Sequence, residues 1–289
     1  MSPPPGAAIP PAFDLFVGVD WSGARGPRLP GLQVAVCRPG NAPPLLLDRP
    51  WTRRGLLDWL AGLPGRTAIG TDCAFAHAWL DEAGYFPGLP GAPDTPFALW
   101  EMVEEACADL PDFYAGLFAR RTAAGAGAHY LAAGHRGARY RSRRRLTELA
   151  CGAALTWPTS TFHGVGPSGV GTGSLAAMRF ARAARARGVA VWPFEPPARQ
   201  TLFEIFPRAY YVMAGGDPRG NRDLANLNAI LAFYGSAPVA GTIASEDQGD
   251  ALVAAAAIRW LSLRPAAWRP PAMTGEAAAR EGWIFGVGS

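Results

Sequence analysis

The sequence predicts an α/β domain built on a mixed sheet, and three observations support this class. The 289 residues are enough for one large domain with a substantial core. Short apolar runs typical of strands alternate with amphipathic segments typical of helices. The first strand-like run is followed by two closely spaced ones and then by a helical segment. That order favours an antiparallel meander with a crossover to a further strand.

The first predicted strand is an apolar run that stops at an acid. Phe16-Val-Gly-Val leads into Asp20, and Trp-Ser-Gly follows as a tight turn. A carboxylate in this place is held by rigid backbone and faces the mouth of the sheet, where a cation or phosphate can approach. The alternative is that Asp20 only caps the turn, which is ordinary chemistry for Asp before Ser-Gly.

The remaining elements follow from periodicity and from turn residues. Thr52 and Ser245 are expected to cap helices that run to Leu60 and Leu263, and Ser174 to cap one that runs to Arg187. Further strands are expected at 31–37, 44–48, 67–72, 189–192 and 202–206. Further helices are expected at 97–121, broken at Pro111, and at 143–154 and 221–234. Loops are expected at 125–137 and 157–173. Residues 282–285 are expected to form either a short strand or an apolar tail segment.

The domain organisation follows from these elements. Residues 1–12 are rich in Pro and Ala and are expected to form a disordered tail. Residues 13–289 are expected to form a single domain, and the sheet is interrupted at 74–188 by a mostly helical insertion. No sharp linker flanks this insertion, so it is not expected to be a separate domain.

Composition limits the classes of partner and compartment. The net charge is +4 and the basic residues are all arginine, so an anionic partner such as nucleic acid is permitted. The four cysteines are far apart, with no paired histidines nearby, which excludes a typical zinc cluster or disulfide framework. No signal peptide or membrane-spanning run is visible, so we expect a cytoplasmic protein with no membrane partner.

Four aspartates form the strongest candidate site. Asp20 and Asp72 each end a predicted strand, and Asp247 and Asp250 stand three apart in the first turn of the helix that Ser245 caps. Acids in a first turn also complement the helix dipole, which is the structural alternative for that pair. Clustered carboxylates cannot all stay ionised without a cation, and hard oxygen ligands favour Mg²⁺ or Mn²⁺.

Four segments resemble a known family when taken in their order along the chain. They are Val-Gly-Val-Asp20, Ile-Gly-Thr-Asp72, Phe-Glu204-Ile-Phe-Pro207 and Glu-Asp247-Gln-Gly-Asp250-Ala-Leu-Val-Ala-Ala. Together they resemble the DUF429 family of predicted RNase H-like nucleases, and the last also resembles the final helix of RuvC-type resolvases. The resemblance implies a ribonuclease H-like fold and metal-dependent phosphodiester chemistry. Here Cys-Ala-Phe follows Asp72, where the family would have Ala-Pro.

Glu204 and an arginine-rich stretch are further candidates. Glu204 lies between aromatic residues on a predicted strand, and either ligates a metal or pairs with an arginine of the insertion. The residues expected to contact nucleic acid are Arg136, Arg139, Tyr140, Arg141, Arg143, Arg144 and Arg145. Arginines with an interleaved aromatic suit phosphate contacts and base stacking, although a solvated, salt-bridged surface gives the same pattern.

Two weaker signals remain. Residues 164–169 fit the pattern G-x-G-x-x-G, but no clean strand precedes them and Pro167 lies inside. A flexible loop near the active site is therefore preferred to a dinucleotide site. His77, five residues after Asp72, could transfer a proton, but an isolated histidine is more often structural.

The acids and arginines together predict a metal-dependent nuclease. Asp20, Asp72 and Asp250, assisted by Asp247 or Glu204, would hold Mg²⁺ or Mn²⁺, and the insertion would grip the nucleic-acid backbone. One alternative is an ATP-dependent phosphotransferase of the actin-like or sugar-kinase type, which needs a second phosphate loop and an adenosine pocket. The other is a non-catalytic nucleic-acid-binding module of the same fold.

Overall fold

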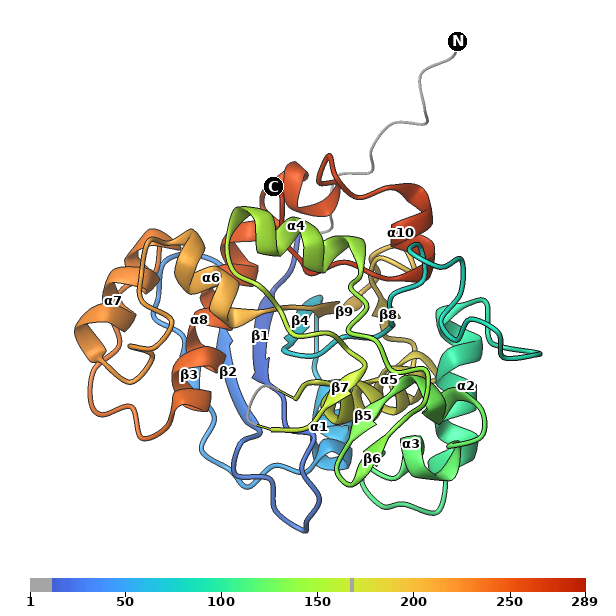
Figure 1. Ribbon diagram of the computed structural model, residues 1–289. Coiled ribbons are helices and arrows are strands. Elements are labelled where there is room, and N and C mark those ends of the chain that lie inside the picture. Colours follow the sequence, from blue (N-terminus) through green and yellow to red (C-terminus); the bar gives the residue numbers. More distant parts are fainter. Residues whose placement is uncertain (1–11, 167–168) are drawn as a thin grey trace.

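A six-stranded mixed sheet forms the centre of the molecule in the computed structural model, which describes residues 12–166 and 169–289 (Figure 1). The strand order is β3-β2-β1-β4-β9-β8. Strand β2 is antiparallel to β1 and β3, whereas β1, β4, β9 and β8 are parallel. The strands are β1 (Leu15–Asp20), β2 (Gln33–Cys37), β3 (Leu45–Leu46), β4 (Thr67–Thr71), β8 (Ala190–Val191) and β9 (Gln200–Glu204). The predicted α/β class is confirmed.

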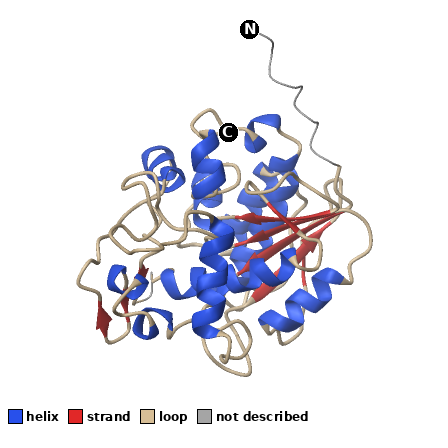
Figure 2. Ribbon diagram, turned by 90° about the vertical axis from the view of Figure 1, so that its right-hand side faces the viewer, coloured by secondary structure: helices blue, strands red, loops and turns tan. Residues whose placement is uncertain are grey.

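Helices pack on both faces of this sheet (Figure 2). They are α1 (Arg53–Ala61), α2 (Pro96–Cys107), α3 (Phe118–Arg121), α4 (Leu146–Ala154), α5 (Gly171–Arg185), α6 (Pro207–Met213), α7 (Leu224–Phe233), α8 (Glu246–Ser262), α9 (Pro265–Trp268) and α10 (Gly275–Arg280). Thr52 caps α1 and Ser245 caps α8, as the sequence predicts: the Thr52 side chain accepts from the amide of Gly55, and Ser245 from that of Gln248.

Alternation along β1 assigns its side chains to two cores. Val17 and Val19 point to the face covered by α1, α2 and α5, while Phe16 points to the face covered by α6, α7 and α8. Both faces of the sheet are covered, so Val17, Ile69 and Leu202 on the parallel strands are fully buried. None of the helices in the described ranges is both long and apolar enough to span a membrane.

Helix α8 lies directly against β1 because of a glycine. A Cβ atom at Gly18 would overlap the amide nitrogen of Ala255 and the carbonyl oxygen of Ala251. Only glycine permits this approach of helix and strand backbones. The contact also places the first turns of α8 beside the end of β1, where Asp20 lies.

The segment between β4 and β8 contains the predicted helices, and it shares its core with the sheet. Phe118 and Phe162 from this segment belong to the same apolar cluster as Val17 of β1. The predicted loops at 125–137 and 157–173 also contain the 3₁₀ helix η1 (Ala126–His129) and a second sheet of β5 (Leu131–Ala132), β6 (His135–Arg136) and β7 (His163–Gly164).

Three local predictions need correction or lie outside the structure. Ser174 is not an N-cap: α5 begins at Gly171, and the Ser174 hydroxyl donates to the carbonyl of Val170 inside the helix. Helix α6 was not predicted, although Pro207 occupies its first turn, where proline is favoured. Residues 1–11 of the predicted tail, and Pro167 within the glycine motif, lie outside the described residues.

Candidate carboxylate site and adjoining pocket

The structure brings all four predicted aspartates to one edge of the sheet. Asp20 is the last residue of β1, and the amide of Asp72, just after β4, donates to the carbonyl of Val19 at 3.0 Å. Asp247 and Asp250 lie in the first turns of α8, which the contact at Gly18 holds against β1. Asp247 also faces the β1–β2 connection, since a Cβ at Gly31 would lie 3.9 Å from its carboxyl group.

Burial and mutual repulsion perturb these carboxyl groups. Burial raises the pKa of Asp20 well above its usual value, and the charges of Asp72, Asp250 and Asp247 raise it further. The carboxyl groups of Asp20 and Asp247 are within hydrogen-bonding reach. Burial also raises the pKa of Asp72, with added repulsion from Asp250 and Glu204. The four groups therefore act as one electrostatic cluster.

Asp250 titrates near neutral pH. Burial raises its pKa to about 7, while the neighbouring Asn221 and Tyr211 side chains lower it. Asn221 Nδ2 donates to Asp250 Oδ1 at 3.4 Å. The sequence did not indicate that these two residues lie beside Asp250. Tyr211 lies on the unpredicted helix α6, and Asn221 precedes α7 in a turn with no recognisable motif.

The aspartate cluster has no cationic partner in the described part of the chain. None of its four members belongs to an ion pair there. The Oδ1 atom of Asn221 is buried without a hydrogen-bond partner. Ionised carboxylates crowded next to an unpaired polar atom are unfavourable, and either protonation or a further group that binds there relieves the repulsion. The arrangement thus resembles a binding site more than a structural ion-pair network.

Glu204 has the second of its two predicted roles, because it pairs with an arginine of the insertion. Arg145 donates to the two carboxylate oxygens of Glu204 at 2.6 and 2.5 Å, and to Glu148 at 2.8 Å. All three side chains are buried. Burial raises the pKa of Glu148, while Arg145 lowers it. Glu204 therefore borders the aspartate cluster as a carboxylate that is ion-paired with Arg145.

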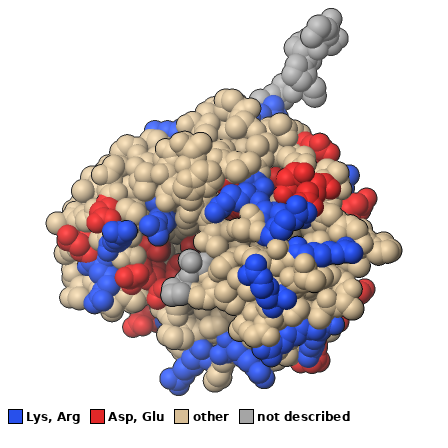
Figure 3. All heavy atoms as spheres, viewed as in Figure 1, with Lys and Arg blue, Asp and Glu red and all other residues tan. Residues whose placement is uncertain are grey.

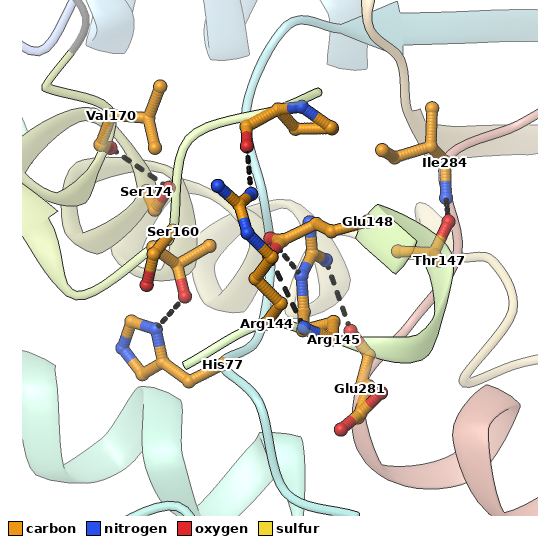
Figure 4. A network of polar contacts seen from close by, with 12 residues as sticks. His77, Arg144, Arg145, Thr147, Glu148, Ser160, Val170, Ser174, Glu281 and Ile284 are labelled. Atoms are coloured by element: carbon orange, nitrogen blue, oxygen red, sulfur yellow. Dashed lines mark hydrogen bonds and ion pairs between the residues drawn. The ribbon is translucent and has the colours of Figure 1, made fainter. Parts of the chain in front are cut away.

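A second network joins this region to the C-terminal segment. Figure 4 shows Arg145 between Glu148 and Glu281. Arg145 Nη1 donates to the Glu281 carbonyl at 3.2 Å, and the Glu281 side chain accepts from the amides of Trp79, Leu80 and Leu146. One guanidinium thus connects α4, β9 and the end of the chain.

The arginine-rich stretch divides into buried and accessible members. Arg143 is buried, pairs with Asp81 and donates to the carbonyl groups of Gly84 and Tyr85. Arg143 and Arg145 are buried and ion-paired within the fold, so their side chains are not exposed for the expected contact with nucleic acid. The more accessible members are Arg136, Arg139, Arg141 and, partly, Arg144 and Tyr140.

A pocket of about 540 Å³ opens beside the aspartate cluster. The residues that line it include Asp72, Glu204, Trp21 and Gly23, together with Gly164, Gly166 and Gly169 before α5. Figure 3 shows acidic atoms in a hollow of this face and basic atoms on both sides of it. The loop at Gly23 is fixed in place, because Arg53 donates to the carbonyl groups of Ser22 and Ala24.

His77 has a structural role in the fold. It is fully buried, with Nδ1 2.8 Å from Thr161 Oγ1 and Nε2 2.5 Å from the Tyr130 hydroxyl. Burial lowers its pKa well below the usual value, and the nearby charges of Arg145 and Arg143 lower it further. The ring is therefore neutral and fully hydrogen-bonded, and it does not line the pocket.

Comparison of the chain with protein-family models, with curated proteins and with solved structures finds no significant match. Within residues 12–166 and 169–289, no three His, Cys, Asp or Glu side chains are already placed to hold a metal ion.

Proposed function

We propose that this chain is an RNase H-like, metal-dependent nuclease that hydrolyses phosphodiester bonds in nucleic acid. The observation that carries the proposal is the cluster of Asp20, Asp72, Asp247 and Asp250 without a cationic partner among the described residues. The sheet supports the same fold: β2 is antiparallel beside the central β1, and the acids lie at the ends of β1 and β4 and on a helix packed against β1.

The residues present fit a divalent cation such as Mg²⁺ or Mn²⁺. Both prefer carboxylate oxygens, and the cluster offers these from three separate elements. The buried Oδ1 of Asn221 adds an unpaired oxygen beside Asp250. When bound, such ions supply an activated water and stabilise the leaving oxygen in phosphodiester hydrolysis.

The chain itself contributes positioning and electrostatics. Asp20 and Asp72 are fixed by adjacent parallel strands, so their separation is set by the sheet. Asp250 has a pKa of about 7 without a cation, so it can accept or release a proton near neutral pH. Arg136, Arg139 and Arg141 are exposed outside the cluster, where arginines suit phosphate contacts. Arg139 donates to the carbonyl of Pro87 and Arg141 pairs with Glu82, so these two would exchange those partners for a phosphate.

The decisive experiment compares Asp20→Asn with the parent protein. The substitution keeps the shape of the side chain and removes its charge, so Mg²⁺- or Mn²⁺-dependent cleavage of single-stranded, duplex and branched DNA and RNA should disappear. Asp48→Asn, at an exposed aspartate after β3, is the matched control.

Cys73→Ser should keep its activity, because no step uses the thiol, whose pKa is raised well above the usual value by burial. Activity that survives Asp20→Asn would overturn the proposal.

The pocket favours a second candidate, an ATP-dependent phosphotransferase. Its volume accommodates a nucleoside, and Gly164, Gly166 and Gly169 before α5 line it together with Asp72. A nucleoside triphosphate with Mg²⁺ should then raise the melting temperature of a protein that shows no nuclease activity. No thermal shift with nucleotides, together with cleavage of nucleic acid, would exclude this candidate.

A further inference from the structure

Trp157 is an exposed aromatic residue between α4 and the pocket. Its side chain is 57% exposed, whereas half of the ten tryptophans are buried in the cores. The next two residues, Pro158 and Thr159, line the pocket that also contains Asp72. A large aromatic surface is thus presented to solvent at the rim of the candidate active site.

The exposed ring is held in position. A Cβ atom at Gly152 would overlap the indole, so the ring packs directly on the backbone of α4. The Arg144 guanidinium lies 5.2 Å from the ring centroid and donates to the carbonyl of Pro158. Trp157 and Arg144 form what we call the rim platform, a supported ring beside a positive charge.

The charge of Arg144 beside the ring favours a nucleic acid over an apolar partner. Arg136 and Arg141 are exposed elsewhere in the same stretch of chain, where Arg136 lies 5.1 Å from the ring centroid of Tyr140 and Arg141 pairs with Glu82. An aromatic ring next to arginines provides stacking for a base and charge for its phosphate. In a duplex, only the terminal base pairs have an unstacked face, so an unpaired base uses the ring far more readily.

We propose that the rim platform stacks an unpaired base and thereby selects single-stranded nucleic acid. This inference rests on the proposed nuclease function for its biological meaning, but the binding step is independent of catalysis. A base on Trp157 would place the adjoining strand at the mouth of the pocket, on the path to Asp72. Arg144 would contact the phosphate of the stacked nucleotide.

The test measures binding without cleavage. Fluorescence anisotropy of a labelled oligothymidylate and of a duplex of equal length is recorded in EDTA for the parent, Trp157→Ala and Trp157→Phe. Loss of one stacked base should weaken single-strand binding by about 5- to 100-fold in Trp157→Ala. Duplex binding should change by less than about 2-fold, because it depends on phosphate contacts. Phe233→Ala, an exposed aromatic of α7, is the control and should bind as the parent does.

Rescue and catalysis separate the possible explanations. Trp157→Phe keeps an aromatic ring and should restore most of the affinity for the single strand. If Trp157 only supported the fold, its loss would weaken binding of the single strand and of the duplex alike. Equal affinity of parent and Trp157→Ala for the single strand, or an equal loss for single strand and duplex, would overturn the platform. Absence of metal-dependent cleavage with Trp157-dependent binding intact would overturn the nuclease proposal and leave the platform standing.

Discussion

Replacing Asp250 with asparagine tests whether the aspartate cluster is electrostatically strained. The pKa of Asp250 is about 7 in the folded chain, against 3.8 for a free side chain. This difference corresponds to about 4 kcal/mol when the group is ionised. Asp250 is partly open to water, so we expect about half of this, roughly 2 kcal/mol, to be measurable.

The sign follows from proton linkage. A raised pKa means that the folded protein binds this proton more tightly than the unfolded chain does. The contribution of Asp250 to stability is therefore complete below about pH 4 and is lost as the pH rises to about 7. Asp250→Asn removes the titration and still accepts the hydrogen bond from Asn221. The variant should thus be more stable than the parent at about pH 8, and nearly equal to it at about pH 4.

Urea unfolding at both pH values measures the effect, with Asp48→Asn as the control. The expected difference at high pH is roughly 2 kcal/mol in the free energy of unfolding, which is well outside the error of the method. Excess Mg²⁺ should stabilise the parent and reduce the advantage of Asp250→Asn. A variant that is no more stable than the parent at high pH would show that the cluster carries no repulsion, and the reasoning would fail.

Two further predictions concern the scaffold of the site. Gly18→Ala should lower the free energy of unfolding by about 3 kcal/mol or prevent folding, because the new Cβ meets the backbone of α8. Thermal unfolding measures the effect. Gly275→Ala is the control, because the space around Gly275 is open. Arg145→Met should cost about 3–5 kcal/mol, because it leaves two buried glutamates unpaired. Adding Glu204→Gln should recover part of that loss, and a double variant as unstable as Arg145→Met would contradict the ion-pair account.

The parts of the fold that sequence could predict depend on local chemistry. The caps at Thr52 and Ser245 and the strands that end at Asp20 and Asp72 are set by neighbouring residues, and the structure has them where expected. The convergence of the acids was also predictable, since parallel strand ends meet at one edge of the sheet. Ser174 failed as a cap because glycine and threonine before it also accept helical dihedrals.

The parts that failed depend on contacts distant in sequence. Arg143 and Arg145 have the same local pattern as the accessible arginines, and only Asp81 and Glu204 across the fold make them structural. The choice for Glu204 between a metal and an arginine could not be resolved for the same reason. Trp157 gave no signal, because exposure of one aromatic depends on how α4 and the loop after it pack.

The packing of α8 on β1 has a consequence for how the protein forms in the cell. Gly18 and Ala255 touch, although they are far apart along the chain. During translation β1 emerges well before α8 and keeps one apolar face uncovered until α8 leaves the ribosome. Long-range contacts of this kind form slowly and expose apolar surface to other chains. Production of this protein should therefore depend on chaperone capacity and improve when translation is slowed at low temperature.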